Sequence, residues 1–114
     1  MGTENREALR SVSQAAFGQQ HRLELMLCIA NAEDGIFSLT ELAKALDVTM
    51  SSLQRPMDSL LATQLISALP DADSKYRYYT RNPSAAWAWA HELAQQADEV
   101  EAVGTELTRV HAPR

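Results

Sequence analysis

A chain of 114 residues with 46% apolar and 22% charged residues is typical of one soluble globular domain. No apolar run approaches the roughly 18 residues that a membrane span needs, and residues 1–7 lack the apolar core of a signal peptide. The single cysteine, Cys28, excludes an intrachain disulfide, so the sequence predicts a cytoplasmic protein that has no membrane contact. The net charge of −5 argues mildly against a dedicated nucleic-acid binder. However, residues 36–83 carry 5 basic and 5 acidic groups, so the acidic excess lies in the flanks.

The N-terminal part predicts two helices. The first has an apolar stripe that includes Leu9 and Val12. Gly18 interrupts this pattern, and a second helix is expected over about residues 19–32. Gly35 follows the second helix and can end it, because glycine readily adopts the left-handed conformation.

The middle of the chain predicts two short helices joined by a tight turn. Ser38 is followed three residues later by Glu41, which is a capping box and marks a helix start. Thr49 can cap a second helix whose buried stripe includes Leu53. A helix fits the DNA major groove when another helix braces it across the backbone, so this pattern favours DNA binding.

A hairpin follows these helices. Residues 65–69 predict an apolar strand and residues 76–81 a second strand, with a polar turn between them. The fold class is therefore mainly α with a small β-hairpin, a winged helix-turn-helix with long terminal dimerisation helices. We divide the single domain, 1–114, into N-terminal helices (1–35), a helix-turn-helix with its wing (36–83) and a C-terminal helix (84–114).

The C-terminal helix carries a heptad stripe. A helix of about 27 residues spans roughly 40 Å, more than a small domain covers by itself. The stripe contains Ala86, Trp89, Leu93, Gln96, Val100, Val103, Leu107 and Val110. It could pack on the chain's own first helix, or on a second copy in a two-fold dimer. For the dimer, the predicted interface residues are Leu9, Val12, Trp89, Leu93, Val100, Val103 and Leu107.

A family resemblance covers roughly residues 18–82. Residues 18–27 resemble the opening helix of ArsR-type winged-helix repressors, and residues 38–46 resemble their bracing helix. Residues 50–61 are similar to their recognition helix, and residues 75–79 to their basic, tyrosine-containing wing. MarR-type proteins share much of this pattern. The resemblance implies a dimeric DNA-binding transcriptional regulator, and we interpret it as a repressor that reads an inverted repeat.

Candidate DNA contacts lie on the second helix of the pair and on the wing. Base-edge contacts are predicted for Ser51, Gln54 and Arg55, because arginine can bond guanine bidentately and glutamine can bond adenine. Backbone contacts, which position the protein without reading sequence, are predicted for Ser52, Lys75, Arg77 and Arg81. The alternative is an ordinary solvated polar face.

Two residues depart from the family pattern. Pro56 removes one helical hydrogen bond and should leave the Ser52 carbonyl unpaired. It is either a tolerated kink or a device that reshapes the groove-facing surface. Asp58 stands close to where a lysine often occurs, and its charge repels phosphate.

No motif supports an enzyme, a metal site or a cofactor. The bracing helix, residues 38–46, has no Cys or His to form the thiolate pair of metal-sensing relatives. His91, Asp98 and His111 do not match the spacing of a dimer-interface zinc site. Cys28 lies among aliphatic residues and is expected to be a buried, inert thiol.

Two other hypotheses remain open from the sequence. One is a protein-interaction module that has lost DNA binding, which the net charge, Pro56 and Asp58 favour. The other adds a small hydrophobic effector to the regulator, bound in a dimer cleft lined by Phe17, Trp87 and Trp89.

Overall fold

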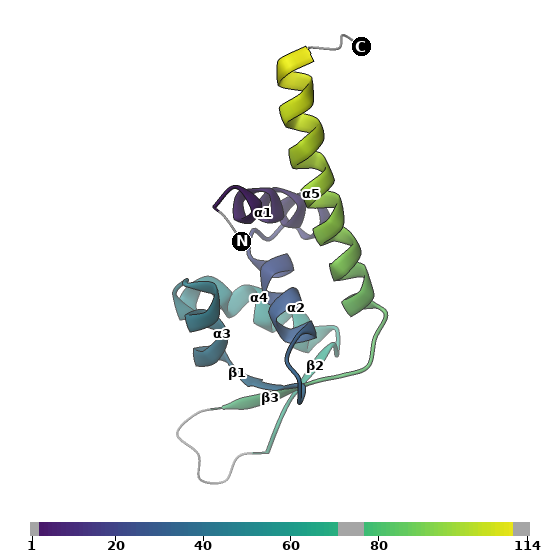
Figure 1. Cartoon of the computed structure of the whole chain (residues 1–114). Coiled ribbons are helices and arrows are strands. Elements are labelled where there is room, and N and C mark those ends of the chain that lie inside the picture. The colour runs from purple at the N-terminus through teal and green to yellow at the C-terminus, as the bar shows by residue number, and fades with distance from the viewer. Residues whose placement is uncertain (1–2, 71–76, 111–114) are drawn as a thin grey trace.

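A computed structural model describes the backbone of residues 3–70 and 77–110, and the side chains of residues 6–70 and 77–99. The described part contains five helices and a three-stranded sheet (Figure 1). In chain order the elements are α1 (Thr3–Phe17), α2 (Arg22–Ala30), β1 (Ile36–Ser38), α3 (Leu39–Leu46), α4 (Met50–Ala62), β2 (Ile66–Ala68), β3 (Tyr78–Arg81) and α5 (Ala86–Val110). This order confirms the predicted winged helix-turn-helix.

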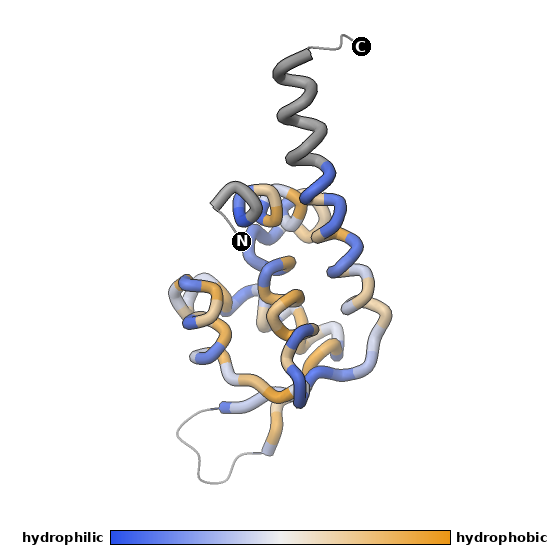
Figure 2. The backbone as a smooth tube through the Cα atoms, viewed as in Figure 1, coloured by the Kyte–Doolittle hydropathy of each residue, from blue (hydrophilic) through white to orange (hydrophobic). Residues whose placement is uncertain are grey.

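Helix α2 is the centre of the core. Leu23, Leu25 and Ile29 have no exposed surface, and Met26 has 1% exposed. The hydropathy colouring shows several apolar residues along α2, which lies among the other helices (Figure 2). Helix α2 contacts α1, α3, α4 and α5, so the first and the last helix both pack on it.

The two helix starts form as the local signals predicted. The Ser38 hydroxyl accepts a hydrogen bond from the Glu41 backbone N–H at 3.2 Å, and the Glu41 carboxylate accepts one from the Ser38 N–H at 3.0 Å. The Thr49 hydroxyl accepts from the Ser52 N–H at 3.2 Å. Asp47 ends α3 in the left-handed conformation and turns the chain toward α4.

The wing belongs to a three-stranded antiparallel sheet with the order β1-β3-β2. The sequence placed strands at residues 65–69 and 76–81, and the observed strands are one to two residues shorter at their ends. Strand β1 lies at one edge of the sheet, and its Phe37 pairs with Tyr79 of β3. Their rings stack with centroids 6.1 Å apart, which joins the sheet to the core.

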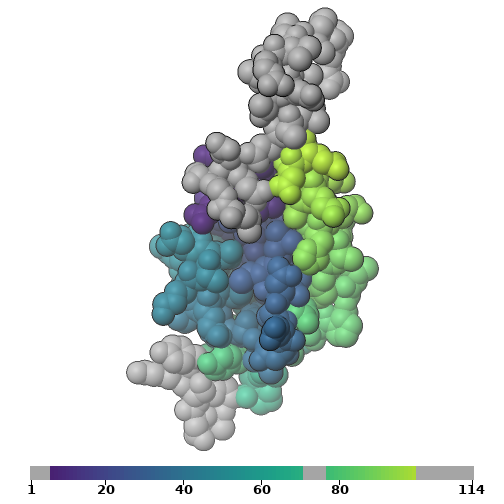
Figure 3. Space-filling view, viewed as in Figure 1, coloured from purple at the N-terminus to yellow at the C-terminus, as the bar shows by residue number. Residues whose placement is uncertain are grey.

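Helix α5 packs along α1 and α2 and projects beyond the body of the domain (Figure 1). In the space-filling view it covers the side of the molecule opposite to α3 (Figure 3). Its buried face is formed by Trp87, Ala90, Leu93 and Ala97. In its N-terminal half the predicted stripe faces outward at Trp89, which is 44% exposed, and at Gln96, while the buried positions belong mainly to the neighbouring face. No helix among the described residues is long and apolar enough to cross a membrane.

Candidate nucleic-acid interface

Helix α4 has one buried face and one exposed face. Leu53, Pro56, Met57 and Leu60 point into the core. Ser51, Ser52, Gln54, Arg55 and Asp58 are exposed. Pro56 therefore lies on the buried face of α4, which favours a tolerated proline over one that reshapes the groove-facing surface. The helix is continuous from Met50 to Ala62, so the proline is accommodated inside it.

The exposed face mixes cationic, polar and anionic groups. No described residue makes a hydrogen bond or ion pair with the Arg55 guanidinium, so it is available to an external acceptor. One turn apart, the Gln54 amide nitrogen donates to the Asp58 carboxylate at 3.1 Å. This bond occupies a donor that Gln54 would need for bidentate contact with adenine. The Ser52 hydroxyl lies 2.7 Å from the Thr49 hydroxyl at the start of the helix.

Arg81 has a structural role that the sequence did not reveal. Its Nη1 donates to three carbonyl oxygens at the end of α2, those of Ile29 at 2.7 Å, Ala30 at 3.1 Å and Ala32 at 2.9 Å. Gly35 lies against the same guanidinium, where an added Cβ would be 3.6 Å from Nη2. The predicted phosphate contact at Arg81 is therefore corrected, because this group is already occupied inside the protein.

The other predicted wing contacts are placed only in part. Arg77 is exposed and stands just before β3. Lys75 lies outside the described residues. The wing therefore offers one described arginine at a position from which it could reach a DNA backbone.

The predicted dimer residues divide into two groups. Leu9 and Leu93 are 4% and 6% exposed and pack inside their own protomer, so they leave little surface for a partner and are corrected as interface residues. Val12 is half-buried, and the exposed Trp89 meets Phe17 edge to face, with centroids 5.3 Å apart. The Arg22 guanidinium lies 4.8 Å from the centre of the Phe17 ring, and burial lowers its pKa. The side chains of Val100, Val103 and Leu107 lie outside the described part of α5.

The effector cleft predicted between two copies stays a prediction, and two of its three aromatic residues, Phe17 and Trp89, lie in contact. Trp87 is buried, and its indole N–H donates to the Asn82 carbonyl at 2.7 Å. A cavity of about 230 Å³ lies between α1, α2 and α3, where Arg6, Glu24 and Cys28 contribute to its lining. Burial raises the pKa of the Cys28 thiol, which disfavours the reactive thiolate and agrees with an inert cysteine.

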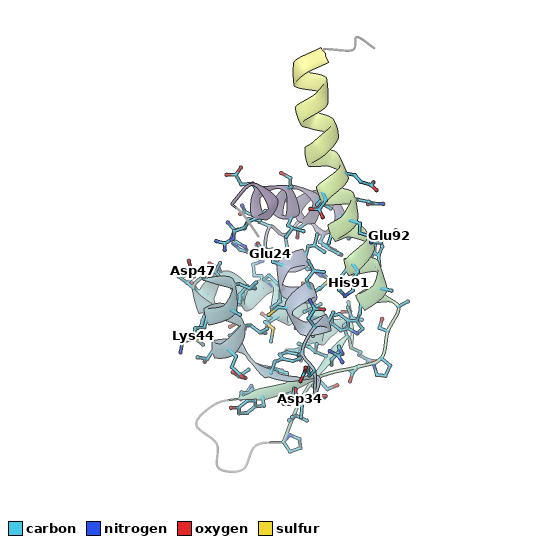
Figure 4. All side chains as sticks on the ribbon, viewed as in Figure 1. Glu24, Asp34, Lys44, Asp47, His91 and Glu92 are labelled. Atoms are coloured by element: carbon cyan, nitrogen blue, oxygen red, sulfur yellow. The ribbon has the colours of Figure 1, made fainter. Side chains whose placement is uncertain are left out.

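Sequence reasoning missed the contacts that fix α1 to α2. The Arg10 Nε donates to the Glu24 carboxylate at 2.7 Å, and Glu24 is only 7% exposed although it is acidic. Figure 4 shows Glu24 between α1 and α2, whereas His91 and Glu92 lie along α5. The only sequence signal for the contacts between α1 and α2 is Glu24, an acidic residue inside an apolar helical stretch. Among residues whose placement is described, no three His, Cys, Asp or Glu side chains gather to hold a metal ion.

Comparison with known proteins identifies the architecture. No protein-family model matches the chain, and no curated protein sequence is significantly similar to it. Among solved structures, a mutant of MarR from E. coli has a TM-score of 0.63 at 20% identity, over 96% of this chain and 89% of that one. BpsR from Bordetella bronchiseptica gives 0.65 at 15% identity, over 96% and 86%. BldR from Sulfolobus solfataricus gives 0.55 at 17%, over 88% and 69%.

The chain has a MarR-like winged-helix fold. The sequence resemblance had named ArsR-type repressors, with MarR-type proteins sharing much of the same pattern. Membership of either family stays a prediction. At these identities the likeness concerns the fold, so the function has to be argued from the site.

Proposed function

We propose that the chain is a DNA-binding transcriptional regulator, a repressor that acts as a homodimer in the cytoplasm and catalyses no reaction. The exposed face of α4 on a winged-helix body carries this proposal. Ser51 and Arg55 lie together on that face, and no described residue occupies the Arg55 guanidinium. Arginine on an exposed recognition helix is the side chain best suited to bond the O6 and N7 atoms of guanine. The names of two structural neighbours, a transcriptional regulator and a protein with regulated DNA binding, agree with this assignment.

In this proposal each side chain has a distinct role. Ser51, Gln54 and Arg55 contact base edges, and Gln54 must exchange its bond with Asp58 for a bond with a base. Ser52, Lys75 and Arg77 contact phosphates. Arg81 stays with the end of α2.

The homodimer is proposed from the two terminal helices. Helix α5 projects beyond the body, and beside α1 it presents Trp89 with 44% of its surface exposed. We assign Val12, Trp89, Val100, Val103 and Leu107 to the interface. A two-fold dimer would place two α4 helices in successive major grooves, so the operator would be an inverted repeat with half-sites about one helical turn apart.

The rival function is a protein-interaction module that has lost DNA binding. The contact between Gln54 and Asp58 favours it, because a carboxylate on the exposed face of α4 would approach the negative DNA. Selection of bound duplexes from a random DNA library, with the mass of the protein measured alongside, separates the two. We expect an enriched inverted repeat bound by a species of twice the monomer mass. A monomer, or a pool without enrichment at low salt, would support the rival.

Replacing Arg55 with alanine should weaken binding to the selected duplex by about 1–3 kcal/mol, roughly 5- to 150-fold, and relax preference at one base pair per half-site. Repeating the selection with the variant measures both effects. Arg6→Ala is the matched control, since it removes one positive charge from an exposed residue of α1. Unchanged base preference in the Arg55 variant would exclude its role in base reading.

We also propose a small-molecule effector, and place its site in the cavity between α1, α2 and α3. That cavity adjoins both a proposed dimer helix and the bracing helix α3, through Leu9, Ala45 and Leu46. A ligand there would contact the two parts whose relative position sets the separation of the α4 helices in a dimer. The DNA binding of BpsR, a protein of the same fold, is regulated by 6-hydroxynicotinic acid.

A further inference from the structure

A hollow lined mainly by polar residues lies beside the exposed face of α4. It has a volume of about 210 Å³ and is formed by the α1–α2 turn, residues 18–21, on one side and by Ser52, Arg55 and Pro56 on the other. None of the sequence motifs pointed to this turn as part of a DNA interface. The hollow is large enough for one phosphate group and open enough to admit one that belongs to a polymer.

The turn is held in a fixed position against α4. The Ser13 hydroxyl donates to the Gln19 carbonyl at 2.5 Å and accepts from the Leu23 N–H at 3.0 Å. From the same turn, the Gln19 amide nitrogen donates to the Ser59 hydroxyl of α4 at 3.1 Å. Because Ser13 is fully buried, its two bonds are shielded from water, and the Gln19 bond to Ser59 joins the turn to α4.

The lining groups suit an anion. Gln20, His21, Ser52 and Arg55 supply amide, imidazole, hydroxyl and guanidinium donors, and none of the described residues lining the hollow carries a carboxylate. The nearest acid to the imidazole is Glu24, 3.4 Å from the His21 Nδ1, and its carboxylate is also bound by Arg10. Amide, imidazole and hydroxyl groups can donate to phosphate oxygens, and the Arg55 guanidinium at the edge of the hollow adds a favourable positive charge.

We propose that this hollow holds one phosphate of the DNA backbone at the edge of the major groove, with Gln20, His21 and Ser52 as its donors. The inference rests on the proposed function, because the phosphate is supplied by the DNA that α4 reads. A contact on the turn side of α4, together with the wing on another side, would fix the helix in the groove. Arg55 would then be directed toward the bases.

The test compares two charge-matched variants, Gln20→Glu and Gln95→Glu. Both residues are exposed, and both changes add one negative charge, but Gln95 lies on α5 away from the hollow. Gln20→Glu should weaken binding to the selected duplex and to random duplex by the same factor, about tenfold, because the new carboxylate repels the phosphate that the amide binds. Gln95→Glu should bind within about twofold of the unmodified protein.

Neutral methylphosphonate placed at single positions of the duplex identifies the phosphate. One position per half-site should weaken binding by the unmodified protein and have no further effect on Gln20→Glu. Equal DNA affinity of the two glutamate variants would overturn the inference and leave the regulator proposal intact. If the unmodified protein binds no DNA, the proposed function itself fails.

A separate titration with inorganic phosphate, followed by the NMR signals of the His21 ring, distinguishes DNA from a free anion. Saturable binding that Gln20→Glu abolishes, with DNA affinity unchanged, would assign the hollow to a free anion and overturn the proposal. Weak, unsaturated shifts together with the loss of DNA affinity would support it.

Discussion

Arg81→Met is expected to lower the free energy of unfolding by about 2–3 kcal/mol, the range for hydrogen bonds that involve a charged group. In the native protein one guanidinium nitrogen serves the carbonyls of Ile29, Ala30 and Ala32. These carbonyls carry the partial negative charge of the α2 C-terminus, so a cation there is favourable. Methionine keeps the aliphatic volume but removes the donors. Urea unfolding followed by circular dichroism measures the change.

Arg77→Met is the matched control for that experiment. Arg77 is exposed and stands just before β3. Replacing it with methionine removes the same charge as Arg81→Met. We expect its stability to change by less than about 0.5 kcal/mol. Arg81→Lys should be intermediate, because an ammonium keeps the positive charge at the end of α2 but lacks the rigid planar geometry of the guanidinium. A stable Arg81→Met protein that binds all DNA more weakly would restore the phosphate contact that the sequence suggested.

The architecture could be predicted because its signals are local. The capping box of Ser38 and Glu41 and the cap at Thr49 both act within three residues, and both formed. Features of this kind need only the propensity of a short segment, which the tertiary structure did not override here.

Arg81 could not be assigned in this way, because its partners are about fifty residues earlier in the chain. A basic residue on a strand is equally compatible with a phosphate and with the carbonyl end of a helix. Only the position of β3 beside the end of α2 decides between them. The Arg81 backbone N–H also donates to the Gly35 carbonyl at 2.8 Å, which holds β3 beside the end of α2.

Helix α5 shows a different limit of sequence reasoning. The sequence of α5 offers two faces that could pack, and its pattern of larger apolar residues favours the face that contains Trp89 for contact with a partner. The observed inner face includes Ala90 and Ala97, which are weak hydrophobic signals but are fully buried. Their small side chains allow α5 to approach α1 and α2 closely. Trp87 is accepted in that face because its indole N–H finds the Asn82 carbonyl.

The DNA-facing site was predictable at the level of a helix face but not at the level of its contacts. The exposed positions of α4 follow from the helical period. The bond between Gln54 and Asp58 has the i,i+4 spacing that favours side-chain pairs, so it could have been inferred. The hollow beside the α1–α2 turn could not, since it depends on Ser13 and Ser59, two ordinary polar residues of separate helices.

Arg10→Met is expected to lower the free energy of unfolding by about 3 kcal/mol, because it leaves a buried carboxylate without its cation. The Arg10 Nε lies 2.7 Å from the Glu24 Oε1, and Glu24 is only 7% exposed. His21 lies 3.4 Å from the same oxygen and offers charge only when protonated. Glu24→Met should be less damaging, since Arg10 is more exposed and can reach water. Denaturant unfolding of both variants gives these values.

The double variant Arg10→Met with Glu24→Met tests why Arg10→Met is less stable. The loss comes either from the missing ion pair itself or from the Glu24 carboxylate that is left buried without a cation. Removing both charges should recover part of the stability lost in Arg10→Met, because apolar residues of similar volume replace a buried ion pair with little cost. Arg6→Met, an exposed arginine one turn earlier on α1, should stay within about 0.5 kcal/mol of the unmodified protein. Additive losses in the double variant would show that the two side chains act separately. Recovery would show that the ion pair couples α1, and with it the proposed dimer helices, to the central helix of the DNA-binding body.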